Sequence, residues 1–89
     1  MLVLPEALTQ TNASACLLDL GAALPTEPAA VVVDASRLSR FDSVALAVLL
    51  ALRRQALQLG KTFFVHGLPQ RMADLARLYG IAELLPAQA

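Results

Sequence analysis

The sequence has few of the residues from which disulfides, metal sites and nucleic-acid interfaces are built. Its 89 residues include one cysteine, one histidine and no tryptophan, and seven basic residues balance seven acidic ones. The lone Cys16 excludes an internal disulfide and a cysteine-based zinc site, and we interpret it as a small buried side chain in a helix. Zero net charge without a run of lysine or arginine disfavours binding to nucleic acids or directly to anionic membranes.

Long hydrophobic runs are also missing. Residues 1–6 lack the basic and hydrophobic regions of a signal peptide, and no apolar run reaches the ~18 residues that span a bilayer. We therefore expect a cytoplasmic protein. Hydrophobic residues nonetheless make up 57% of the chain and charged residues only 16%, which is more apolar surface than one small core can hide. The sequence predicts a single domain, residues 1–89, with a surface for a partner.

No set of residues suited to catalysis or cofactor binding is present. His66 has no second histidine or cysteine with which to hold a metal, and nothing around it completes a nucleophile and base. A glycine-rich phosphate loop with a lysine is missing, which argues against nucleotide binding. We predict a protein that is not an enzyme and holds neither metal nor cofactor.

Short strands alternate with helices along the chain, and this alternation is typical of an α/β layer with crossover helices. Apolar periodicity and the positions of glycine and proline set the expected bounds. Gly60 and Gly80 are expected to end two of the helices. The predicted strands are residues 2–4, 29–34 and 62–65, the predicted helices are residues 12–23, 43–59 and 69–79, and residues 81–85 form a last short turn or strand.

A polar loop between the second strand and the second helix is the most informative feature. The strand ends at Asp34, and the helix opens on Asp42 and Ser43. A carboxylate and a hydroxyl then stand at a helix N-terminus, where free N–H groups and the helix dipole favour a phosphoryl group. The simpler interpretation is that Asp42 or Ser43 caps the helix, which contributes ~1 kcal/mol. Arg37 and Arg40 flank the loop. Three interpretations are open for them: ion pairs with Asp34 or Asp42, contact with acidic groups of a partner, or a solvated surface position.

This arrangement resembles the STAS domain, the family of sulfate-transporter cytoplasmic domains and anti-sigma-factor antagonists. The family motif is a hydrophobic strand, then D-x-S-x-[LV]-x-x-[IVF]-D-[ST], then a leucine-rich helix that ends in glycine. The similarity continues through residues 61–67, which look like the family's next strand, and through residues 73–80. This last run looks most like the MlaB-type STAS subunit of bacterial phospholipid-trafficking ABC transporters. The matching motif residues are Asp34, Ser36, Leu38, Phe41, Asp42, Ser43 and Gly60.

The resemblance implies a compact STAS-like α/β domain, with a small mixed sheet and helices packed mainly on one side. It also implies a regulatory or stabilising subunit that binds the ATPase subunit of a lipid-asymmetry transporter and meets the inner membrane only through that complex. The alternative is an anti-sigma-factor antagonist that is switched by phosphorylation of Ser43. In that group the phosphoacceptor commonly lies one residue later, where this chain has Val44.

The second helix carries two apolar ridges well over 100° apart. The family pattern suggests that the ridge of Leu46, Leu50 and Leu57 faces the sheet. The other ridge, which contains Val44, Val48 and Leu52, is then left exposed to a partner. Burial of that second ridge against the first or third helix is the alternative. The predicted partner-binding residues are Arg40, Asp42, Ser43, Val44, Val48 and Leu52.

The sheet is also expected to have an open edge. Family members generally have more residues before the first helix, enough for an additional strand, whereas residues 1–4 can supply only one. We therefore expect a missing edge strand, or one provided by another chain, and self-association of the isolated protein.

Overall fold

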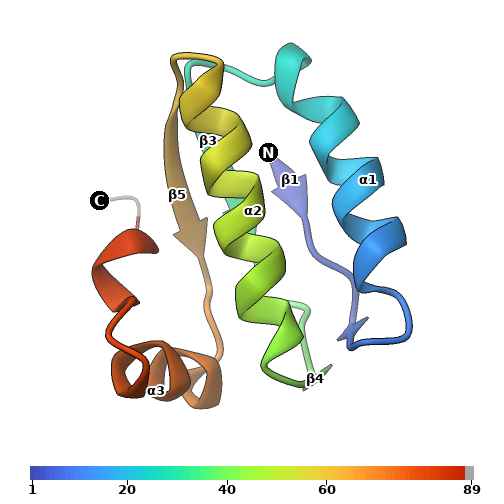
Figure 1. Ribbon diagram of the computed structural model, residues 1–89, viewed down its shortest axis with the longest axis vertical. Helices are drawn as coiled ribbons and strands as arrows, with labels where there is room; N and C mark the ends of the chain where they lie inside the picture. Colours follow the sequence, from blue (N-terminus) through green and yellow to red (C-terminus); the bar gives the residue numbers. More distant parts are fainter. Residues whose placement is uncertain (88–89) are drawn as a thin grey trace.

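Three parallel strands form the main sheet of the computed structural model, which describes residues 1–87 (Figure 1). β3 (Ala30–Asp34) lies between β1 (Leu2–Val3) and β5 (Thr62–His66). The register places Val33 opposite both Leu2 and Val65. A central β3 agrees with its run of small and β-branched residues. The predicted domain spans residues 1–89, of which residues 88 and 89 lie outside the described part.

All strand pairs within residues 1–87 are parallel, whereas the resemblance implies a mixed sheet. β3 is reached through α1 and β5 through α2. Each of these helices carries the chain back to the end where the strands start, and this kind of crossover produces parallel pairs. A second sheet pairs β2 (Ala7–Leu8) with β4 (Arg40–Phe41). Neither of these two strands was predicted, because each is only two residues long.

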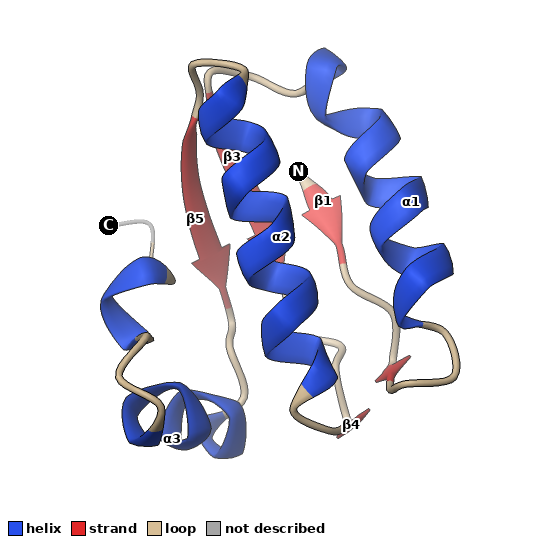
Figure 2. Cartoon of the chain, viewed as in Figure 1, coloured by secondary structure: helices blue, strands red, loops and turns tan. Residues whose placement is uncertain are grey.

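The helices lie mainly on one side of the sheet, as predicted (Figure 2). α1 (Ala13–Ala23) and α2 (Val44–Gln58) pack against each other, and α2 also packs on β5. α3 (Gln70–Leu78) lies at the end where the strands finish (Figure 1). Two short 3₁₀ turns, η1 (Leu24–Thr26) and η2 (Ala82–Leu84), follow α1 and α3. The α/β fold predicted from the sequence is confirmed.

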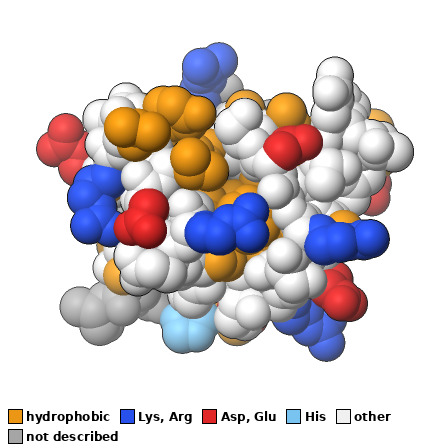
Figure 3. Space-filling model, turned by 90° about the horizontal axis from the view of Figure 1, so that it is seen from below, with side chains coloured by type: hydrophobic (Ala, Val, Ile, Leu, Met, Phe, Trp, Pro, Cys, Tyr) orange, Lys and Arg blue, Asp and Glu red, His pale blue; other side chains and the backbone are white. Residues whose placement is uncertain are grey.

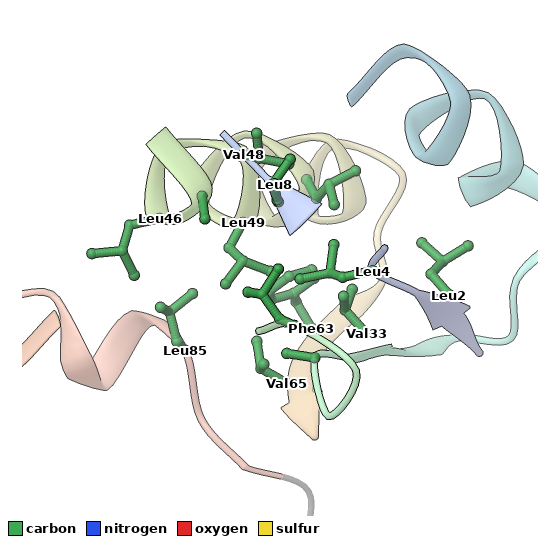
Figure 4. Close-up of a cluster of buried hydrophobic side chains, with 14 of the residues drawn as sticks. Leu2, Leu4, Leu8, Val33, Leu46, Val48, Leu49, Phe63, Val65 and Leu85 are labelled. Carbon is green, nitrogen blue, oxygen red and sulfur yellow. The ribbon is translucent and has the colours of Figure 1, made fainter. Parts of the chain in front are cut away.

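The core lies between the sheet and the two long helices. Burial alternates along β3 and β5, so that Val31, Val33, Phe63 and Val65 face the helices. Figure 4 shows Phe63 and Val33 close to Leu4, with Leu49 reaching down from α2. A fully buried leucine contributes ~1.5–3 kcal/mol relative to an exposed one. The core residues from α2 are Ala45, Leu46, Val48, Leu49, Leu52 and Ala56.

The prediction that Val48 and Leu52 form an exposed ridge on α2 is wrong. Val48 is 3% exposed and Leu52 is 0% exposed, whereas Leu57, expected to face the sheet, is 45% exposed. The physical reason is that α1 packs along α2 and covers the second ridge. The buried sector of α2 is therefore centred between the two ridges, on Ala45 and Leu49.

Candidate partner-binding site

The carboxylate of Asp42 holds the loop that precedes α2. Its Oδ1 atom accepts a hydrogen bond from the Val44 N–H at 2.9 Å, and its Oδ2 atom accepts one from the Gln10 N–H at 3.2 Å. The first bond satisfies a free N–H of the first helical turn. The second ties the loop to the segment before α1. Asp42 is therefore the residue that caps α2, and its side chain also fixes the position of the loop.

The side chain of Ser43 does not take part in capping α2. The residue is exposed and its hydroxyl makes no capping hydrogen bond, while its backbone oxygen accepts the Leu46 N–H at 3.1 Å. The hydroxyl consequently faces solvent at the N-terminus of a helix of fifteen residues. A polar or anionic group of a partner would meet the positive end of the helix dipole there.

An aromatic and basic pair lies beside this loop. The guanidinium carbon of Arg71, from α3, is 5.0 Å from the centre of the half-buried Phe41 ring in β4. Contacts of this kind contribute about 0.5–1 kcal/mol at exposed sites. Arg40, the other residue of β4, is exposed. Sequence reasoning missed the Arg71–Phe41 contact, because the two residues are thirty positions apart and no local pattern links them.

The loop after β3 is organised by Asp34. Its Oδ1 atom accepts the Ser36 N–H at 2.9 Å, and hydrogen bonds from Ser36 lower the pKa of Asp34, with smaller contributions from His66 and Arg37. Ala35 donates its N–H to the His66 oxygen at 2.7 Å. Within residues 1–87 neither Arg37 nor Arg40 forms an ion pair with Asp34 or Asp42.

The structure brings four of the six predicted partner-binding residues together. Arg40, Asp42 and Ser43 are exposed, and Val44 is half-buried at the start of α2. Val48 and Leu52 belong to the core instead. Figure 3 views the end of the molecule that lies lowest in Figure 1 and shows hydrophobic side chains among separate acidic and basic groups. We call Arg40, Asp42, Ser43 and Val44 the α2 entry surface.

Two further observations concern metals and membranes. In the described part of the chain, no cluster of three or more His, Cys, Asp or Glu side chains is arranged to hold a metal ion. Among the helices of residues 1–87, none combines the length and apolar character that crossing a membrane requires.

Comparison with known proteins identifies the family. The family model described as "Mlab, STAS domain" matches residues 1–86 of the 89-residue chain. No curated protein matches the chain. The match includes the β3 strand, the polar loop and α2, where the motif residues Asp34, Ser36, Asp42 and Ser43 lie. The chain therefore belongs to the MlaB-like STAS domain family.

Proposed function

We propose that this protein is a regulatory or stabilising subunit that binds the ATPase subunit of a phospholipid-trafficking ABC transporter and lies on the cytoplasmic side of the inner-membrane complex. STAS domains are generally non-catalytic regulatory or interaction domains. The observation that carries the proposal is the Ser43 hydroxyl, which is exposed at the start of α2 and takes no part in capping the helix.

The α2 entry surface is suited to binding because it is already ordered. Two hydrogen bonds to Asp42 hold the loop in place, so little conformational freedom remains to be lost when a partner binds. The surface combines an exposed cation at Arg40, an anion at Asp42 and a hydroxyl at Ser43 around the partly apolar Val44. Mixed charges beside a small apolar centre favour a specific protein partner over a nonspecific anionic one.

Co-purification with the transporter ATPase subunit from the same genome tests the proposal. Ser43→Glu places a negative charge next to Asp42 at the proposed contact and should cost ~2–5 kcal/mol of binding if the contact excludes water. We expect that the ATPase does not co-purify with this variant. Ser14→Glu is the matched control, because Ser14 is also an exposed serine near the start of a helix, on α1. Equal recovery of the ATPase by both folded variants would contradict the proposal.

The exposed hydroxyl also favours a second candidate function, an anti-sigma-factor antagonist regulated by phosphorylation. A phosphate on Ser43 would add a charge of about −1.5 to −2 at the positive end of α2. With a cognate kinase, mass spectrometry should then find one phosphate on the wild type and none on Ser43→Ala. A wild type that stays unmodified while it co-purifies with the ATPase would argue against this second function.

A further inference from the structure

The outer edge of β1 is open. β1 is the terminal strand of the main sheet, and no strand within residues 1–87 pairs with its free side. Leu4 donates its N–H to the Asp34 backbone oxygen at 2.9 Å. Because backbone direction alternates along a strand, the N–H and C=O of Val3 point away from β3. One residue with both groups free is the smallest unit to which an antiparallel strand can bond.

Helix α1 borders this edge but is incompletely buried. None of its eleven residues is buried, although Cys16, Leu17 and Leu20 pack partly against the core. Figure 1 shows α1 beside β1, on the side away from β3 and β5. An apolar helix normally buries a continuous stripe. The inner side of α1, next to β1, therefore leaves apolar surface uncovered in the described part of the chain.

A groove of about 410 Å³ separates the two elements. Val3 and Leu4 form one wall, and Ala15, Cys16 and Leu20 of α1 form the other. The groove has the two features that an added strand needs, which are a free backbone edge and a lining of small apolar side chains. Its surface does not overlap the α2 entry surface.

The charges along the groove give the added strand a direction. α1 runs opposite to β1 (Figure 1), so Asp19, about two turns into the helix, lies toward the start of β1. Arg37 follows the end of β3, which is parallel to β1, and lines the groove toward the end of β1. A strand antiparallel to β1 would therefore have its first residues near Arg37 and its last residues near Asp19.

We propose that this groove binds an extended segment of a partner protein, which adds to β1 as an antiparallel strand. The segment has an acidic residue at its start, alternating apolar residues in its middle and a basic residue at its end. A second copy of this chain fits less well. Its own β1 is bordered by α1 in the same way, so the two helices would occupy the same space on the same face of the joined sheet.

Binding of the labelled peptide acetyl-ETVTVTK-amide to the full chain tests this proposal by fluorescence anisotropy. Saturable binding is expected, with the central threonine opposite Val3. Ala15→Arg fills the groove and should weaken binding roughly tenfold or more. Ala22→Arg is the matched control, because Ala22 is also exposed on α1 but lines the opposite flank of the helix. This variant should bind the peptide as the wild type does.

Two further measurements distinguish a strand from a nonspecific apolar ligand. A peptide with an N-methylated central threonine cannot donate to the Val3 oxygen and should lose binding. Bound peptide should slow the alkylation of Cys16, the single cysteine, which lines the groove. No saturable binding, or equal binding by the methylated peptide or by folded Ala15→Arg, would overturn the proposal.

The remaining controls separate this proposal from other occupants and from the proposed function. Ser43→Glu should bind the peptide as well as the wild type does, because Ser43 lies outside the groove. Loss of ATPase binding and loss of peptide binding are then independent of each other. Light scattering tests for a dimer formed through the groove, which Ala15→Arg would dissociate. We expect no such dimer of the wild type. Such a dimer would show that a second copy occupies the groove, and the proposal of a partner segment would fall.

Discussion

Single residues set the shape of the two loops at the end where the strands finish. Asp34 ends β3 and accepts the Ser36 N–H, and Gly67 packs against Ser36 from the turn after β5. Gly67 has φ +68°, and a Cβ atom there would lie 2.8 Å from the Ser36 Cβ. Only glycine allows both this backbone conformation and this close approach. The two loops therefore support each other through backbone contact.

The lowered pKa of Asp34 predicts a dependence of stability on pH. A carboxyl group whose pKa is lower in the folded than in the unfolded chain stabilises the fold above its unfolded pKa, and this contribution is lost as the pH falls through the folded value. The ordinary pKa of the group is 3.8. The free energy of unfolding of the wild type should therefore fall more steeply below about pH 3.8 than that of Asp34→Asn.

Chemical denaturation at a series of pH values measures this difference. Ser36→Ala removes the hydroxyl that makes the largest contribution to the shift, so an NMR titration should place the pKa of Asp34 closer to 3.8 in that variant than in the wild type. Identical acid profiles for the wild type and Asp34→Asn would show that Asp34 does not contribute in this way.

At the scale of elements, α2 lies between the sheet on one side and α1 on another. Leu52→Ala should cost about 2–5 kcal/mol of stability, because the side chain is 0% exposed and its removal leaves a cavity. Leu57→Ala is the matched control on the same helix, where the leucine is 45% exposed and the loss should be below about 1 kcal/mol. Urea denaturation measures both, and equal losses would contradict the packing described for α2.

The ends of these elements were more predictable than their faces. Gly60 and Gly80 were expected to end helices, and both adopt a positive φ, 74° and 72°, just beyond α2 and α3. Such signals are local and need no knowledge of the rest of the fold. The exposure of Val48 and Leu52 was mispredicted because periodicity gives the direction of a side chain on its helix but does not reveal that α1 lies there.

Strand pairing shows the same limit. β3 and β5 are five residues long and were predicted from their composition. β2 and β4 consist of two residues each, and their pairing depends on contacts across more than thirty residues of sequence, including hydrogen bonds from the Ser39 and Arg40 N–H groups to the Glu6 oxygen at 2.8 and 3.1 Å. No local sequence pattern predicts a strand pair of this kind.

At the scale of the whole molecule, the two surfaces proposed to bind partners are separate. The α2 entry surface lies where the strands finish, and the groove between β1 and α1 lies along the free edge of the sheet. The sequence motif identified Asp42 and Ser43 as neighbours at a helix N-terminus, but only the structure separates their roles. The Asp42 carboxylate accepts the Val44 N–H, whereas the Ser43 hydroxyl makes no capping hydrogen bond. The groove could not be predicted, because it depends on how α1 sits beside β1.

The most direct test of the central claim is site-specific photo-crosslinking within the assembled transporter complex. A benzoylphenylalanine residue is introduced at position 43 in one sample and at position 14 in another, both exposed positions at the start of a helix. If the α2 entry surface contacts the ATPase, irradiation should join the ATPase to position 43 and leave position 14 uncrosslinked. Crosslinking to the ATPase from position 14 but not from position 43, in a complex that assembles normally, would contradict the account.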